Sequence, residues 1–142
     1  EVLVDAYCGA GFFAKKLRAS FRRVIGLDWD ERSVQAAAQD AEAHEDYRVG
    51  DTAELLSAAL GPAATTVVLL DPPAQGLAPG VIDILLGARP ARIIYVSCDP
   101  ATLARDLSRL AAGYQLLRAS PVDMFPQTAS IETASLLTAS AH

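Results

Sequence analysis

Short apolar runs typical of buried strands alternate along this chain with polar-punctuated segments typical of helices. Five such rounds occupy most of the 142 residues, and two further strand-like runs close the chain. Strands that alternate with helices pair in parallel, because each crossover returns the chain to the same end of the sheet. The alternation therefore predicts an α/β fold with a doubly wound sheet, mostly parallel with an antiparallel closing strand.

The expected strands cover residues 2–7, 23–28, 47–51, 65–71, 93–96, 114–119 and 131–138. The expected helices cover residues of about 12–19, 31–45, 52–60, 79–87 and 100–112, and a turn-rich segment at 121–130 joins the last two strands.

Length and composition narrow the class of protein. A chain of 142 residues fits one domain, residues 1–142, and its start within a strand at Glu1 suggests a piece of a longer protein. No run approaches the ~20 apolar residues of a membrane span, and no leader is visible, so we expect no membrane partner. Two cysteines, Cys8 and Cys98, form no disulfide framework, which favours the cytoplasm. Oligomeric state stays open.

Charge argues against strong nucleic-acid binding by this chain alone. The net charge is −5, whereas affinity for phosphates comes mainly from Lys and Arg. A basic cluster near the first expected helix is interpreted as a solvated helix face rather than an RNA surface. Its members are Lys15, Lys16, Arg18, Arg22 and Arg23.

Glycines and acids at the ends of the expected strands predict a cofactor site. Gly9 and Gly11 follow the first strand, where they let the backbone approach a ligand, and Asp28 ends the second, where it can accept hydrogen bonds from ribose. This pattern alone also suits a nicotinamide-dependent oxidoreductase. Asp5, four residues before Gly9, together with Asp51 and Asp71 at later strand ends, favours S-adenosylmethionine. Four acids at four strand ends are not expected to be helix caps alone. No metal is expected.

Cys98 stands where an expected strand ends and a helix begins. Asp99 and Pro100 form an N-cap arrangement, so the helix dipole and free N–H groups favour a reactive thiolate. A packed free cysteine is the alternative interpretation. Methylation at C5 of uracil requires a thiolate that adds to C6 and a base that removes the C5 proton. Glu132, at the start of the last strand, supplies such a base unless it is only a solvated edge carboxylate.

The chain resembles the RNA 5-methyluridine methyltransferase family. The matching stretches are residues 5–13, 24–28, 70–73 with 76–77, 95–107, and 122–128 with 131–132. The resemblance implies a Rossmann-like methyltransferase sheet, S-adenosylmethionine as cofactor, and RNA (tRNA or rRNA) as substrate. It implies that Cys98 bonds uracil C6, that Glu132 takes the C5 proton, and that Tyr7, the position of Phe12, Asp28 and Asp71 contact the cofactor.

The chain departs from the family pattern near the reaction. The family usually has Asn, Arg and His at the positions of Asp99, Ala74 and Ser130. An ionised Asp99 opposes thiolate formation at Cys98. The family's N-terminal RNA-binding barrel and central segment are also absent from residues 1–142.

Two alternatives to the C5 methyltransferase remain beside the oxidoreductase. The departures and the acidic charge support a degenerate, non-catalytic cofactor- or RNA-binding module derived from the family. An amino-methyltransferase is disfavoured, because Ala74 after Asp71-Pro72-Pro73 has no ring to stack on a base.

Overall fold

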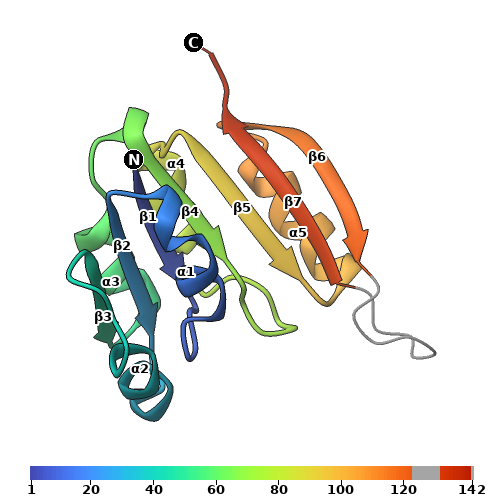
Figure 1. The fold of residues 1–142 in the computed structure, drawn as a ribbon. Helices are drawn as coiled ribbons and strands as arrows, with labels where there is room; N and C mark the ends of the chain where they lie inside the picture. The colour runs from blue at the N-terminus through green and yellow to red at the C-terminus, as the bar shows by residue number, and fades with distance from the viewer. Residues whose placement is uncertain (123–131, 142) are drawn as a thin grey trace.

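A computed structural model describes residues 1–122 and 132–141 of the chain (Figure 1). Within these residues, one sheet of seven strands has the order β3-β2-β1-β4-β5-β7-β6. The strands are β1 (Val2–Ala6), β2 (Arg23–Asp28), β3 (Glu45–Val49), β4 (Thr66–Leu70), β5 (Arg92–Ser97), β6 (Tyr114–Val122) and β7 (Glu132–Ala139). The helices are α1 (Phe12–Leu17), α2 (Glu31–Ala38), α3 (Thr52–Ala59), α4 (Val81–Ala88) and α5 (Pro100–Leu110), with short 3-10 turns η1 (Arg18–Ser20) and η2 (Ala63–Thr65).

The strand directions confirm the predicted doubly wound fold. The first five strands pair in parallel, while β7 runs antiparallel to both β5 and β6. Parallel strands that are joined by helices place all of their carboxyl ends on one edge of the sheet. Because β7 runs the other way, its first residue lies at that same edge (Figure 1).

Side chains alternate between two hydrophobic layers. In β1, Val2, Val4 and Ala6 belong to the core that also contains buried residues of α3, α4 and α5. Leu3 belongs to a smaller cluster on the opposite face, where it packs with Ala14 of α1. This alternation is what a strand buried on both faces requires.

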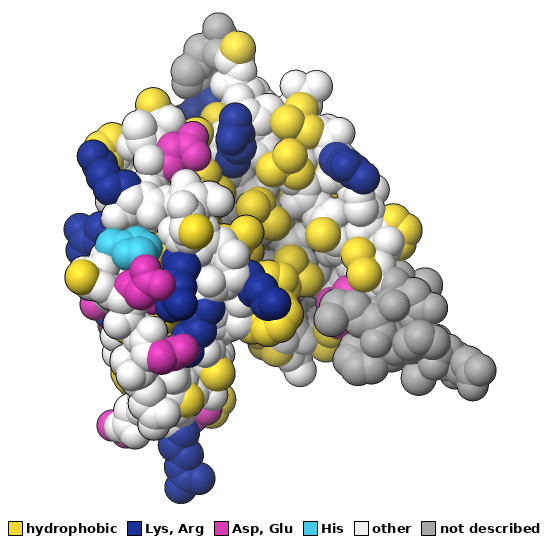
Figure 2. All heavy atoms as spheres, in the orientation of Figure 1, with side chains coloured by type: hydrophobic (Ala, Val, Ile, Leu, Met, Phe, Trp, Pro, Cys, Tyr) yellow, Lys and Arg dark blue, Asp and Glu magenta, His cyan; other side chains and the backbone are white. Residues whose placement is uncertain are grey.

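One part of the sheet is covered on a single face. Helix α5 lies behind β5 and β7, whereas no described helix lies in front of β5, β7 and β6 (Figure 1). Figure 2 shows hydrophobic side chains over this region, which includes Ile94, Ala134 and Leu136 around a shallow cavity. Among the described residues, no helix has both the length and the apolar character needed to cross a bilayer.

Element boundaries differ from the sequence prediction mainly around α2. The helix ends at Ala38 instead of residue 45, and β3 begins at Glu45 instead of residue 47. The acids in the intervening segment turn away to pair with α1 and η1: Lys15 contacts Asp40, and Arg18 contacts Glu42 at 3.0 Å. The segment that follows Ala38 therefore contacts α1 and η1 instead of continuing the helix. Most of the turn predicted at residues 121–130, and residue 131, lie outside the described residues.

Gly26 in β2 generates a prediction about stability. A Cβ atom there would lie 2.6 Å from the Tyr47 ring and 3.0 Å from the Cys8 sulfur. Gly26→Ala should therefore overpack this layer and lower the free energy of unfolding by about 1–3 kcal/mol. Gly87, in helix α4, has open space where a Cβ atom would stand, with no atom within 4 Å, so Gly87→Ala should stabilise by about 0.5–1 kcal/mol. Urea denaturation compares the two, and equal effects would contradict the packing argument.

Candidate active site

The predicted site residues gather along the carboxyl edge of the sheet. Each follows the carboxyl end of a parallel strand, except Glu132, which begins the antiparallel strand β7. In strand order across the sheet they are Asp51 after β3, Asp28 ending β2, Tyr7, Gly9, Gly11 and Phe12 after β1, Asp71 after β4, Cys98 after β5, and Glu132.

The glycine loop after β1 is tied to the end of β2 by one carboxylate. Asp28 accepts a hydrogen bond from the Gly9 amide at 2.8 Å and another from the Asp30 amide at 2.9 Å. Gly9 and Gly11 both have positive φ, of 52° and 82°. The loop therefore turns in a conformation that glycine adopts without strain, and Asp28 holds it against β2.

Asp5 is buried below this loop with half of its carboxylate unpaired. One oxygen accepts a hydrogen bond from the Ala14 amide at 3.0 Å, while Oδ1 has no partner among the described residues. The pKa of Asp5 is raised to about 7, chiefly by burial and also by the charges of Asp71 and Asp28, while the hydrogen bond from Ala14 partly opposes this rise. This edge of the sheet thus concentrates negative charge that a cationic ligand would stabilise.

Asp51 lies between strand β3 and helix α3. Its carboxylate caps α3 by accepting a hydrogen bond from the Glu54 amide at 3.0 Å. Asp51 is therefore a helix cap, because β3 ends directly before the N-terminus of α3. A cofactor contact by Asp51 remains a prediction.

The two aromatic residues predicted to contact the cofactor have different environments. The half-buried Tyr7 has a positive φ of 67°, and its hydroxyl accepts a hydrogen bond from the Ala78 amide at 3.0 Å. Phe12 is 61% exposed at the start of α1, with its ring packed edge-on against Phe13. Tyr7 therefore links two loops, while Phe12 is largely exposed, with the Lys16 ammonium group over its ring at 5.9 Å from the ring centre. Sequence reasoning missed Trp29, which is 76% exposed directly after Asp28.

Cys98 lies exposed in the turn between β5 and α5. The Ser97 hydroxyl accepts from the Asp99 amide at 3.2 Å, and the Asp99 carboxylate caps α5 by accepting from the Thr102 amide at 2.6 Å. The predicted N-cap is therefore confirmed. These hydrogen bonds from Thr102 hold the pKa of Asp99 below its usual range. A negative charge consequently stands beside the thiol.

The register of β5 and β7 brings Cys98 opposite Glu132. The last paired positions are Ser97 and Thr133, and one further step along both antiparallel strands reaches Cys98 and Glu132. Directly opposed residues have Cβ atoms about 5 Å apart when such pairing continues. The backbone positions of these two chemistry-bearing residues, which are 34 residues apart in sequence, thus lie at adjacent strand ends on one edge of the sheet.

The charge of Glu132 influences Asp71, and Glu132 also lines a small cavity. The pKa of Asp71 is raised to about 6, mainly by burial and also by the charge of Glu132. The cavity has a volume of about 230 Å³. Its lining residues are Phe12, Phe13, Val96, Val122, Glu132 and Ala134. Asp71, Cys98 and Glu132 are thereby placed in one neighbourhood, beside an apolar hollow.

Ala74, one of the positions at which the chain departs from the family pattern, lies exposed in the loop after β4. Ser130, another of these positions, lies outside the described residues.

Sequence reasoning also missed the buried Asp106 in α5. The sequence contains a pattern that could have indicated this residue. Asp106 lies three residues after Leu103 and four before Leu110, so an acid occupies a position on the apolar face of the expected helix.

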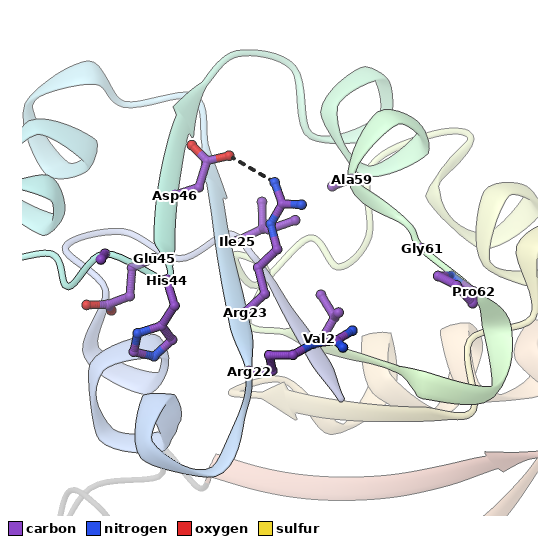
Figure 3. Close-up of a pocket in the computed structure, with 11 residues that line it drawn as sticks. Val2, Arg22, Arg23, Ile25, His44, Glu45, Asp46, Ala59, Gly61 and Pro62 are labelled. Carbon is purple, nitrogen blue, oxygen red and sulfur yellow. Dashed lines mark ion pairs between the residues drawn. The ribbon is translucent and has the colours of Figure 1, made fainter.

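A larger cavity lies at the opposite edge of the sheet and contains none of the predicted residues. Its volume is about 590 Å³, and Arg22, Arg23 and His44 line it near the amino ends of β1, β2 and β3 (Figure 3). Arg23 is 3.8 Å from Asp46 there (Figure 3). Like Arg18, Arg23 is matched by an acid, which fits the interpretation of these residues as a surface without net attraction for RNA.

Comparison with known proteins identifies the family. The model of the tRNA (uracil-5-)-methyltransferase family matches residues 48–140. Uncharacterized RNA methyltransferases of Nitratidesulfovibrio vulgaris and Gloeobacter violaceus are 45% and 41% identical, over 96% of this chain and 31% and 30% of their own lengths. The chain belongs to the tRNA (uracil-5-)-methyltransferase family. It spans about a third of the length of the curated relatives it matches.

Solved structures agree with this assignment. The tRNA (uracil-54, C5)-methyltransferase of Pyrococcus abyssi, crystallised with S-adenosyl-L-homocysteine, superimposes with a TM-score of 0.81 at 29% identity, over 96% of this chain and 34% of that one. The N-methyltransferase NodS of Bradyrhizobium japonicum has a TM-score of 0.78 at 14% identity, over 99% of this chain and 79% of that one. The NodS likeness shows the fold alone.

Asp5 generates a prediction about pH dependence. Its pKa in the folded chain, about 7, lies above the ordinary value of 3.8, so the folded state holds more protons between these limits. The free energy of unfolding must then fall as pH rises from about 4 to 7, by at most about 4 kcal/mol from this group. Asp5→Asn stays neutral and should remove that part of the fall. Urea denaturation at pH 4.5 and 8 measures it, with the exposed Asp83→Asn as control. A fall as steep in Asp5→Asn as in the unsubstituted chain would contradict the assignment.

The two cysteines should differ in reactivity. Cys8 is buried, and burial raises the pKa of its thiol, as do the charges of Asp5 and Asp28, whereas Cys98 is exposed. Iodoacetamide at pH 7.5 should modify Cys98 at least about tenfold faster than Cys8, as peptide mass spectrometry can measure. Both should react alike in urea. Equal rates in the folded chain would show that Cys98 is not accessible as described.

Proposed function

We propose that this chain is the catalytic domain of an enzyme that transfers a methyl group from S-adenosylmethionine to C5 of a uridine in tRNA or rRNA. The observation that supports the proposal is the β5–β7 register, whose last pair, Ser97 and Thr133, lies next to Cys98 and Glu132 at the edge where Asp71 follows β4. A C5 methyltransferase needs this combination of one thiolate and one base. The similar Pyrococcus abyssi protein, a tRNA (uracil-54, C5)-methyltransferase, supports the same reaction at a tRNA uracil.

The residues at the carboxyl edge fit S-adenosylmethionine. The unpartnered oxygen of buried Asp5, together with Asp28 and Asp71, supplies negative charge for a ligand that carries ammonium and sulfonium groups. The residues that would hold the cofactor are Tyr7, Gly9, Gly11, Phe12, Asp28, Asp51 and Asp71. Bound S-adenosylmethionine supplies an electrophilic methyl group on its sulfonium.

Cys98 and Glu132 divide the chemistry on uracil between them. The Cys98 thiolate forms a bond to C6, which moves the electron pair of the C5–C6 double bond to C5 and makes that carbon nucleophilic. After C5 has gained the methyl group, Glu132 removes the remaining C5 proton. The double bond then forms again, and the thiolate leaves C6. The opposed positions of the two residues allow both to reach the same ring.

Two opposite charges stand near Cys98. The N-terminus of the 11-residue helix α5 carries a partial positive charge, and the ionised Asp99 next to Cys98 carries a negative charge. An Asn at this position would cap the helix equally well without the charge. The structure therefore gives a physical reason to compare the rate of this enzyme with that of an Asp99→Asn variant.

RNA affinity is proposed to depend on parts of the protein beyond residues 1–142. The chain has a net charge of −5, and Lys15, Arg18 and Arg23 each pair with acids. The curated relatives are about three times as long as the matched region. A catalytic domain of this charge would rely on additional cationic surface to hold a phosphate backbone.

A covalent trap tests the two catalytic roles in the intact protein. With RNA that contains 5-fluorouridine, fluorine replaces the proton that the base must remove, so a methylated protein–RNA adduct should accumulate on the Cys98 peptide. Cys98→Ala should abolish both the adduct and methyl transfer while cofactor binding persists. Glu132→Gln should slow turnover by about 10²–10⁴-fold and accumulate the adduct on ordinary RNA.

Matched controls are available within the chain. Cys8→Ala and the exposed Glu54→Gln should retain adduct formation and turnover. Transfer by Cys98→Ala would contradict the nucleophile. Absence of any adduct in a protein shown to bind S-adenosylmethionine and RNA would favour the non-catalytic binding module.

A further inference from the structure

The loop between β4 and α4 carries Asp71 and is anchored at its far side by one buried carboxylate. Asp106 in α5 has no exposed surface. Its Oδ2 accepts a hydrogen bond from the Leu77 amide at 3.0 Å, and its Oδ1 accepts from the guanidinium of Arg105 at 2.9 Å. Arg105 in turn donates to the Gln75 carbonyl at 3.0 Å. Two neighbouring residues of α5 thus hold two positions of the loop, Gln75 and Leu77.

The same carboxylate is joined to the strand that leads to Cys98. The Tyr95 hydroxyl donates to Asp106 Oδ2 at 2.8 Å, and Tyr95 lies three residues before Cys98 in the chain. Helix α5 itself begins two residues after Cys98. Asp106 therefore connects the Asp71 loop to both elements that flank the proposed nucleophile.

Gly76 shows how closely the loop is seated on α5. Its φ is +86°, and a Cβ atom on it would lie 2.6 Å from both Arg105 Nη2 and Asp106 Oδ2. The loop backbone thus approaches the helix at a distance that excludes any side chain. At its other side the Ala78 amide donates to the Tyr7 hydroxyl, so the loop is fixed between β1 and α5.

Stability alone is a weak explanation for this carboxylate. Burying a charged group is costly, and well-packed apolar residues often stabilise a fold as well or better. The other buried side chains of α5 are Leu103 and Leu110, so an apolar residue would continue that face. What an apolar residue cannot do is accept hydrogen bonds from the loop and the strand together.

We propose that Asp106 is a positioning residue that fixes the loop of residues 71–80, and with it Asp71, relative to Cys98. The inference rests on the proposed function, because it assigns Asp71 and Cys98 to one reaction. Reacting groups require placement to within a fraction of an ångström, and a shift of 1 Å costs about 100-fold in rate. Asp106 acts through these neighbours and touches neither cofactor nor uracil.

Three variants of the intact protein test the proposal. Asp106→Ala removes the acceptor, and Gly76→Ala pushes the loop off α5 while leaving the Asp106 carboxylate unsubstituted. Each should lower kcat for RNA methylation by about 100-fold. The dissociation constant for RNA should change less than about threefold, and that for S-adenosylmethionine, which Asp71 is proposed to contact, should change less than about tenfold. Asp106→Asn should stay within about tenfold of the unsubstituted kcat, because its amide oxygen still accepts from Leu77 and Tyr95. Asp83→Asn, on the exposed side of α4, is the control.

Amide hydrogen exchange gives a second readout that does not depend on activity. Protection of the Leu77 amide should fall at least about tenfold in Asp106→Ala and be restored in Asp106→Asn. Unchanged protection or unchanged kcat in folded Asp106→Ala would overturn the proposal, as would a loss that appears only in the dissociation constants. If Asp106→Ala does not fold, the kcat of Gly76→Ala decides. An unsubstituted protein without methyl transfer would instead refute the proposed function, while exchange at Leu77 would still decide whether Asp106 holds the loop.

Discussion

Parallel pairing of β2, β1, β4 and β5 forces their carboxyl ends onto one edge of the sheet, and every proposed role depends on that edge. Right-handed crossovers leave no other arrangement for strands that alternate with helices. The reversal at β7 adds the decisive residue, because only an antiparallel strand could begin with Glu132 where β5 ends at Ser97. The topology thus brings Cys98 and Glu132 to neighbouring strand ends, and the chemistry proposed for them rests on that placement.

The edge is also where the fold tolerates unfavourable electrostatics. Asp5 is buried with one unpaired oxygen, and the pKa values of Asp5 and Asp71 are raised to about 7 and 6. Such groups destabilise the empty chain near neutral pH, since burial penalises their charged forms. A cationic cofactor would offset that penalty. Asp106 has a different role, because hydrogen bonds from Leu77, Tyr95 and Arg105 meet its carboxylate on both oxygens.

Local patterns in the sequence predicted the fold and most of the residues that lie at the carboxyl edge of the sheet. The Asp99-Pro100 pair marked the start of α5, and the apolar runs located all seven described strands, because strand burial leaves a direct mark on composition. Contacts between distant segments could not be predicted in this way. Helix α2 ends earlier than predicted, and the segment after it pairs Asp40 and Glu42 with Lys15 and Arg18. The links from Asp106 to Leu77 and Tyr95 likewise depend on how α5 packs. The roles of Cys98 and Glu132 came from chemistry and family resemblance, and remain proposals.

Release of tritium from RNA labelled at C5 of uridine tests the central claim most directly. Transfer to C5 by Cys98 and Glu132 requires that this hydrogen leave as a proton, one for each methyl group gained. The intact protein with S-adenosylmethionine should therefore release tritium in a 1:1 ratio with methylation, and Cys98→Ala should release none. Methylated RNA that keeps its tritium would place the methyl group on another atom and contradict the account.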